Sequence, residues 1–147
     1  MPPIFAGAFF IPMEDRRFTF PAAEKLKSRK LIQQLFASGK TIHVPPVTCH
    51  FLMNPAVLSV PLQVGVGVSA RQFKKATDRN RIKRLLREAY RLNKHEIHIA
   101  LTETEQALVV FLLYNGKELP NFQIIERTVQ QVLGMLVARI ASSANAR

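Results

Sequence analysis

The stretch RQFKKATDRNRIKRLLREAYRLNK, residues 71–94, is the segment around which the rest of the chain is organised. It holds ten of the 21 Lys and Arg residues and only two acids, Asp78 and Glu88. Ten cations less two acids give it a net charge of +8, against +11 for all 147 residues. The positive charge of the chain is therefore concentrated in one short segment.

The apolar residues of this segment recur at the spacing of one side of an α-helix. They are Ile82, Leu85, Leu86, Ala89 and Tyr90. The opposite side carries Asn80, Lys83, Arg84, Arg87 and Arg91, with Arg79 and Arg81 at the margins of the first turn. No Gly or Pro interrupts the pattern, and Thr77 or Asp78 is placed to cap the N-terminus. One side of the helix suits a core, and the other is a row of cations.

This row of cations predicts contact with a polyanion. Like charges at i, i+4 spacing repel each other by a few tenths of a kcal/mol per pair, and only Glu88 is present to relieve them. A solvated helix face is the alternative. An uncompensated row of this kind more often serves to bind a polyanion, and the predominance of Arg suits bidentate contact with phosphate.

The length and the apolar fraction of 48% are those of one globular domain, expected over residues 20–141. Residues 1–19 have no periodicity and predict a poorly ordered extension, in which Met13 is an alternative start; residues 142–147 are expected to fray. The lone Cys49 cannot form an internal disulfide, which fits a cytoplasmic location. No apolar run approaches the roughly 20 residues of a membrane span, so no membrane contact is expected.

The remaining pattern predicts an α+β fold, an α/β sandwich with one small mixed sheet and about three helices. The first helix is expected over residues 28–38, with Ser28 as its cap and Gly39 as a left-handed stop. Strands are expected over residues 47–53, 63–69 and 107–114, with at most a short edge piece over 41–44. Asn121 is expected to cap a last helix over about residues 122–140.

The strand QVGVGVS, residues 63–69, has valines on one face and Gly65 and Gly67 on the other. Glycines in a strand often mark close approach by another backbone or a ligand. Close packing of a helix over the glycine face is the equal alternative.

The chain offers little for catalysis. Its ten carboxylates are spread out, and it has no Gly-rich phosphate loop and no nucleophile motif. His95 and His98 lack further ligands for zinc and are expected in a polar helix end or loop. Phe36, Phe51 and Phe73 are candidates for stacking on bases, with a place in the core as the alternative for each.

The residues RNRIKRLLREAYR, 79–91, resemble the RNR signature of the bacterial ribonuclease P protein subunit. The resemblance extends to LKSRKLIQQLFASGK, residues 26–40, which is similar to the first helix of that family, and to the strand at 64–69 that precedes the signature. It covers about residues 20–140.

This resemblance implies a ribosomal-protein-like fold with a left-handed β-α-β crossover around the RNR helix. It implies the catalytic RNA of ribonuclease P and precursor tRNA as partners, with the protein monomeric within the ribonucleoprotein. The activity would be endonucleolytic removal of the 5′ leader, with Mg²⁺ held mainly by the RNA and the substrate. The catalytic groups would then lie on the RNA.

The resemblance also assigns residues to two surfaces. The RNA-binding residues would be Arg79, Asn80, Arg81, Lys83, Arg84, Arg87 and Arg91, together with Lys74 and Lys75. A cleft between the first helix and the sheet would hold the single-stranded leader through Phe36, Phe51 and Ile32.

The chain departs from the family pattern in two places. Ile32 stands where the family often has an aromatic residue, and Ala70 and Arg71 stand where it usually has two lysines. Lys74 and Lys75 follow slightly later and take over part of that charge.

Two alternatives share the charge arguments. One is a non-catalytic structural RNA-binding protein associated with the ribosome. The other is a basic amphipathic helix on an acidic membrane, which would have to expose the apolar side that the core needs.

Overall fold

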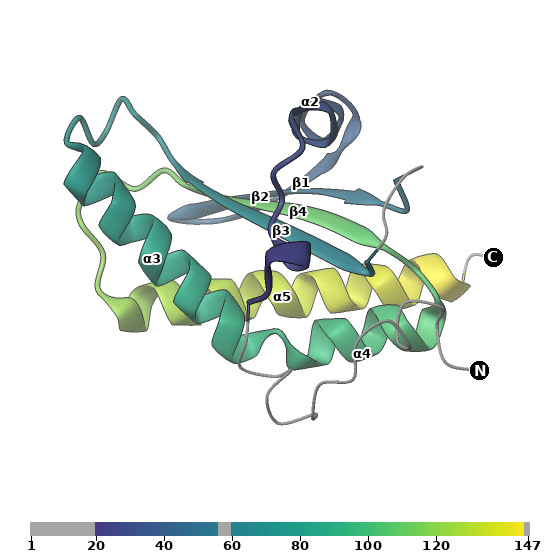
Figure 1. Ribbon diagram of the computed structural model, residues 1–147. Helices are drawn as coiled ribbons and strands as arrows, with labels where there is room; N and C mark the ends of the chain where they lie inside the picture. Colours follow the sequence, from purple (N-terminus) through teal and green to yellow (C-terminus); the bar gives the residue numbers. More distant parts are fainter. Residues whose placement is uncertain (1–19, 56–59, 146–147) are drawn as a thin grey trace.

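The computed structural model describes residues 20–55 and 60–145, which form a four-stranded sheet between two layers of helix (Figure 1). The elements are the short 3-10 helix η2 (Ala22–Glu24), α2 (Arg29–Ser38), β1 (Lys40–Val44), β2 (Val47–Met53), β3 (Leu62–Val68), α3 (Ala76–Asn93), α4 (His95–Thr104), β4 (Leu108–Tyr114) and α5 (Phe122–Asn145). The α+β class is as expected from the pattern.

The sheet has the strand order β1-β2-β4-β3, with antiparallel pairs except for the parallel pair β3 and β4. The helices α3 and α4 form the connection between these two parallel neighbours. The apolar run of β4 lies in the centre of the sheet, as predicted. The left hand of the crossover stays a prediction from the family.

The two faces of the sheet have different covers. Helices α3 and α5 cover one face, which we call the core face, and α2 lies across part of the other, which we call the open face (Figure 1). Strand alternation sends Val110 and Leu112 of β4 to the core face and Val109 and Phe111 to the open face. Because both faces receive helices, β4 is apolar on both sides.

The boundaries of several elements differ from those expected. The pattern predicted about three helices, whereas the described residues form four α-helices, because residues 95–104 are the separate helix α4. His95 and His98 therefore lie in a helix and not in a loop. The last helix continues to Asn145, beyond the predicted end. The predicted extension, residues 1–19, lies outside the described residues.

The predicted caps are right for two helices and wrong for one. Ser28 Oγ accepts a hydrogen bond from Leu31 N at 3.3 Å, and Asn121 Oδ1 accepts one from Ile124 N at 2.9 Å. Neither Thr77 nor Asp78 caps α3, which begins after Lys75 without a side-chain cap. Gly39 follows α2 with an ordinary φ of −76°, so it is not a left-handed stop.

Residues 20–28, which we call the strap, cross the edge of β3 and connect the two faces. Phe20 packs on Tyr90 of α3 with ring centroids 5.1 Å apart, on the core side. Leu26 N donates to Val64 O at 3.1 Å, and the Leu26 side chain joins the apolar cluster beneath α2. The strap therefore fixes where α2 lies relative to α3.

A buried polar cluster holds the strap to the end of α3. Lys94 is only 1% exposed, and its Nζ lies 2.9 Å from Oε2 of Glu24. The Tyr90 hydroxyl donates to the same carboxylate at 3.2 Å, and His98 Nε2 lies 3.2 Å from it. Burial acts to raise the pKa of Glu24, but the hydrogen bond and charge of His98 and the charge of Lys94 outweigh it and hold that pKa below its ordinary value.

We expect Glu24→Gln to destabilise the fold strongly. It leaves the Lys94 ammonium buried without its counter-charge, and removing one partner of a buried pair costs about 3 kcal/mol or more. Urea unfolding at neutral pH measures this loss.

In the wild-type protein the stabilisation from Glu24 is complete above the ordinary carboxyl pKa of 4.5 and is lost as the pH falls through the lower pKa that Glu24 has in the folded protein.

The matched control is the double variant Glu24→Gln/Lys94→Met, which removes both charges. It should retain more stability than the single variant, because no uncompensated charge stays buried. Equal losses in the two variants would show that the ion pair does not hold the strap.

Candidate nucleic-acid interface

The basic side of α3 faces away from the core, as the spacing predicted. Ile82, Leu86, Ala89 and Tyr90 are all 0% exposed, so the helix is fixed by its apolar side. Most of the side chains that point outward from the helix and from the loop before it are cationic or amide. Asn80, Arg81, Arg84 and Arg87 are exposed, Lys83 is half-buried, and Arg71, Lys74 and Lys75 are exposed in the loop.

Two arginines of the predicted set are engaged within the protein. Arg91 Nε donates to Oε2 of Glu88 at 3.2 Å, and this contact lowers the pKa of the Glu88 carboxyl. Arg79 Nη1 donates to the carbonyls of Phe73 and Lys74, each at 2.8 Å. The row of cations is therefore partly tied to its own helix and loop.

A second candidate surface lies on the open face beside α2. Phe36, at the end of α2, is 47% exposed. Its ring centroid lies 4.5 Å from that of His50 on β2 and 5.3 Å from that of Phe111 on β4. These three residues, which we call the aromatic set, come from three elements and lie together on one face. Partial burial lowers the pKa of His50, which favours a neutral imidazole able to stack.

The two glycines of β3 are occupied by Phe111 and not by a helix. A Cβ on Gly67 would lie 2.7 Å from the far carbon of the Phe111 ring, and one on Gly65 would lie 3.0 Å from its near edge. Phe111 is paired with Gly65 across the sheet, so its ring lies over the bare backbone of β3. Close packing of a helix over this face is therefore wrong as an expectation, because a neighbouring side chain fills the space, with Leu26 Cβ of the strap 3.4 Å from the Cβ position on Gly65. Close approach by a ligand stays a prediction.

Polar side chains border the aromatic set on the β1 side. His43 Nδ1 and Thr48 Oγ1 lie 2.9 Å apart, and Asn115 Nδ2 donates to the same hydroxyl at 2.8 Å. Across the sheet, His50 of the aromatic set is paired with Thr41 and Phe111. The open face thus combines rings with hydrogen-bonding groups, the combination that single-stranded nucleic acid needs.

The structure corrects one residue assigned to this face. Phe51 is only 2% exposed and lies on the core face, where the guanidinium of Arg139 is 5.9 Å from its ring centroid. It therefore cannot line the cleft. Ile32 does lie on the open face, partly buried against the cluster beneath α2. Phe73 is buried and packs on Tyr114, so it is not available for stacking.

Sequence reasoning missed His50 and Phe111. The alternation of residues 47–53 placed His50 opposite Phe51, but that alternation does not say which side the core takes. Phe111 lies inside an apolar run with no polar partner to set it apart. Only the position of α2 shows which rings stay accessible.

A further group of cations lies beside α2. Lys25 and Lys27 in the strap and Arg29 and Lys30 in the first turn of α2 are all exposed. The one acid near them in the sequence, Glu24, is engaged with Lys94 and His98. Cations in the first turn of a helix oppose its dipole, so a polyanion would relieve this surface too.

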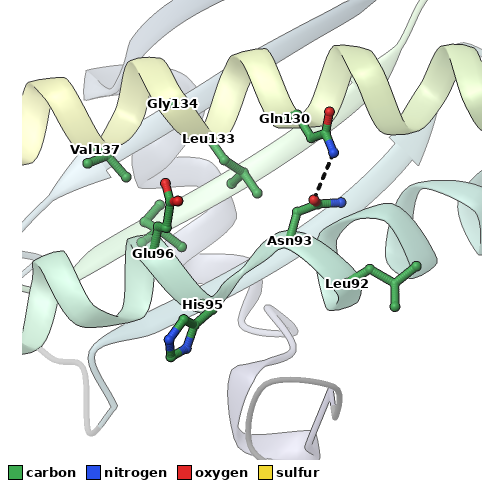
Figure 2. Close-up of a pocket in the computed structure, with 9 residues that line it drawn as sticks. Leu92, Asn93, His95, Glu96, Gln130, Leu133, Gly134 and Val137 are labelled. Atoms are coloured by element: carbon green, nitrogen blue, oxygen red, sulfur yellow. Dashed lines mark hydrogen bonds between the residues drawn. The ribbon is translucent and has the colours of Figure 1, made fainter.

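A groove of about 380 Å³ separates the α3–α4 junction from α5 (Figure 2). Asn93 Oδ1 accepts a hydrogen bond from Gln130 Nε2 across it at 3.0 Å, and His95 and Glu96 lie on its α4 side.

Within residues 20–55 and 60–145, no group of three or more His, Cys, Asp or Glu could hold a metal ion. Over the same residues, the helices are too short or too polar to cross a membrane.

Known proteins share both the sequence and the fold. The Ribonuclease P family model matches residues 20–137. The ribonuclease P protein component of Porphyromonas gingivalis is 33% identical over 127 residues, covering 86% of this chain and 93% of the relative. That of Geotalea uraniireducens is 33% identical over 122 residues, covering 82% and 97%.

Two solved structures have a similar fold. The RNase P protein of Thermotoga maritima superposes with a TM-score of 0.59 at 25% identity, over 75% of this chain and 94% of that one. The Staphylococcus aureus RNase P protein superposes with a TM-score of 0.62 at 18% identity, over 77% and 94%. The chain therefore belongs to the ribonuclease P protein family, the RNA-binding protein components of the endonuclease that processes the 5′ end of tRNA.

Proposed function

We propose that the chain uses two separate surfaces for two RNAs. The basic side of α3 docks on the catalytic RNA of ribonuclease P, and the open face holds the 5′ leader of precursor tRNA. The observation that carries this division is the aromatic set: it lies on the face of the sheet opposite α3, with Phe36 47% exposed.

Docking through α3 is electrostatic. The exposed guanidinium groups of Arg81, Arg84 and Arg87 point away from the core, where each can neutralise a phosphate and release condensed counterions. Asn80, also exposed, adds directional hydrogen bonds. A duplex or a folded RNA presents such phosphates irrespective of base sequence.

Leader binding relies on stacking. Phe36 and His50 present ring surface to a base, and stacking on an aromatic side chain is worth about 1–3 kcal/mol per base. Thr48 and Asn115 lie next to them and can hydrogen-bond to bases or sugars. Because mature tRNA has no leader, this surface favours the precursor.

The exposed cations of the strap and of the first turn of α2 support the same role. The backbone of Lys25 pairs with Val64 of the edge strand β3, so the strap that carries these cations runs along the edge of the sheet. The Lys25 ammonium itself lies 5.7 Å from the ring centroid of Phe20, on the core side. Leader phosphates passing the edge of the sheet would be neutralised there.

The catalytic centre and its Mg²⁺ ions belong to the RNA in this proposal. The described residues contain no carboxylate cluster that could hold them, so the ions would be held by the RNA and by substrate phosphates. The contribution of the protein is binding and orientation. By neutralising phosphates it would also lower the magnesium concentration that the reaction needs. We propose a single protein copy per ribonucleoprotein, in the cytoplasm, where the lone buried Cys49 stays reduced.

A purely structural role in an RNA-protein particle is the competing function, and leader cleavage at low magnesium separates the two. We expect the protein to stimulate cleavage of precursor tRNA by a bacterial ribonuclease P RNA when magnesium is limiting. Gel analysis of the released leader measures the rate. Tight RNA binding without any stimulation would favour the structural role.

Arg84→Ala should weaken binding to the catalytic RNA and make its salt dependence shallower. The side chain is exposed on α3, and the loss of one phosphate contact reduces the salt slope by about one. Filter binding over a range of salt concentrations measures both. Arg127→Ala, an exposed cation on α5, is the control and should change neither. An unchanged slope for Arg84→Ala would mean that this side chain does not touch phosphate.

Phe36→Ala should reduce affinity for precursor tRNA and leave mature tRNA nearly unaffected. The loss of one stacking platform corresponds to about 5- to 150-fold in affinity. Binding of the assembled holoenzyme to the two tRNAs measures the difference. Met135→Ala is the matched control, because Met135 is 48% exposed on α5. Equal losses for both tRNAs would remove Phe36 from the leader site.

A further inference from the structure

The first arginine of the RNR signature, Arg79, does not project freely with the other exposed cations of α3. It lies in the first turn of the helix, and its Nη1 donates to the carbonyls of Phe73 and Lys74, both at 2.8 Å. Both acceptors belong to the loop of residues 69–75, which connects β3 to α3. One guanidinium nitrogen therefore joins the helix to two consecutive peptide groups of the preceding loop.

This loop has few other restraints. Ser69 N donates to Tyr114 O at 3.1 Å, and Ser69 O accepts the longer bonds from Gln72 N and Phe73 N at 3.3 and 3.4 Å. The Phe73 ring is buried against Tyr114, with centroids 6.0 Å apart. Between this ring and the start of α3 at Ala76, the two hydrogen bonds to Arg79 are the side-chain contacts that hold the described backbone.

The position of Arg79 is otherwise unfavourable. A cation in the first turn of a helix opposes the helix dipole, and α3 begins at Ala76, after Lys75, with no side-chain cap. Charge-assisted bonds to two carbonyls offset this cost, because hydrogen bonds with an ionised donor are stronger than neutral ones. The two restrained peptide groups flank Lys74 and precede Lys75, and both of these side chains are exposed.

We propose that Arg79 is a positioning residue. It clasps the loop and so presents Lys74 and Lys75 to the RNA backbone in one continuous surface with α3. This inference rests on the proposed docking of α3 on the catalytic RNA. It separates Arg79 from Arg81, whose exposed side chain makes no hydrogen bond to the described residues, and assigns the two arginines of one motif different roles.

A thermodynamic cycle tests the clasp. Affinity for the catalytic RNA is measured for the wild type, Arg79→Ala, Lys74→Ala/Lys75→Ala and the triple variant. If Arg79 acts through the lysines, the double lysine substitution lowers RNA affinity less in the Arg79→Ala background than in the wild type. The two losses of affinity should differ by on the order of threefold or more. The control is the same cycle with Arg81→Ala in place of Arg79→Ala. Here the fold loss of RNA affinity in the triple variant should equal the product of the losses from Arg81→Ala and from the double lysine substitution.

A second readout needs no RNA. Hydrogen exchange of the backbone amides of residues 71–75 in the free protein should be faster in Arg79→Ala and unchanged in Arg81→Ala. This exchange experiment tests the restraint of the loop by Arg79 independently of RNA binding. Failure of the proposed docking of α3 would show separately, because the wild-type protein would then not bind the catalytic RNA.

Two results would overturn the proposal. One is an equal loss of affinity from the lysine substitutions with and without Arg79, which would make Arg79 an independent phosphate contact. The other is unchanged exchange of the loop in Arg79→Ala, which would show that the two hydrogen bonds do not restrain it.

Discussion

Burial of the apolar side of α3 is the interaction on which the other features depend. Ile82, Leu86 and Tyr90 are fully buried against the sheet and α5, and each such side chain contributes about 1.5–3 kcal/mol. Repulsion between neighbouring cations on the outer side costs only a few tenths of a kcal/mol per pair. Burial therefore outweighs repulsion, and the helix can present a row of positive charge that would not be stable as an isolated helix.

The same burial leaves the opposite face of the sheet for a different task. Alternation along β4 sends every second apolar residue away from α3, and α2 covers only part of this surface. Phe111 lies flat over the glycines of β3 and supports Phe36. The strap, anchored by Glu24 and Lys94, ties α2 to the end of α3, so the positions of the two proposed RNA-binding surfaces are linked through one buried ion pair.

Periodicity was enough to predict the class, the central strand and the orientation of α3, because these follow from where apolar residues recur. It could not show which face of β2 meets the core, and the resemblance assigned Phe51 to the cleft, whereas the half-buried His50 lies on the open face. Two further features were also outside its reach. The bond from Arg79 to the loop carbonyls and the helix formed by residues 95–104 depend on packing that local spacing does not encode.

The central claim is that two different RNAs occupy the two surfaces at the same time. Photo-crosslinking in the assembled holoenzyme tests it directly, with photoreactive nucleotides placed either in the leader of precursor tRNA or in the catalytic RNA, and mass spectrometry of the linked peptides. We expect leader crosslinks in the peptides that contain Phe36, His50 and Phe111, and catalytic-RNA crosslinks in those of α3. Leader crosslinks confined to α3 would contradict the account.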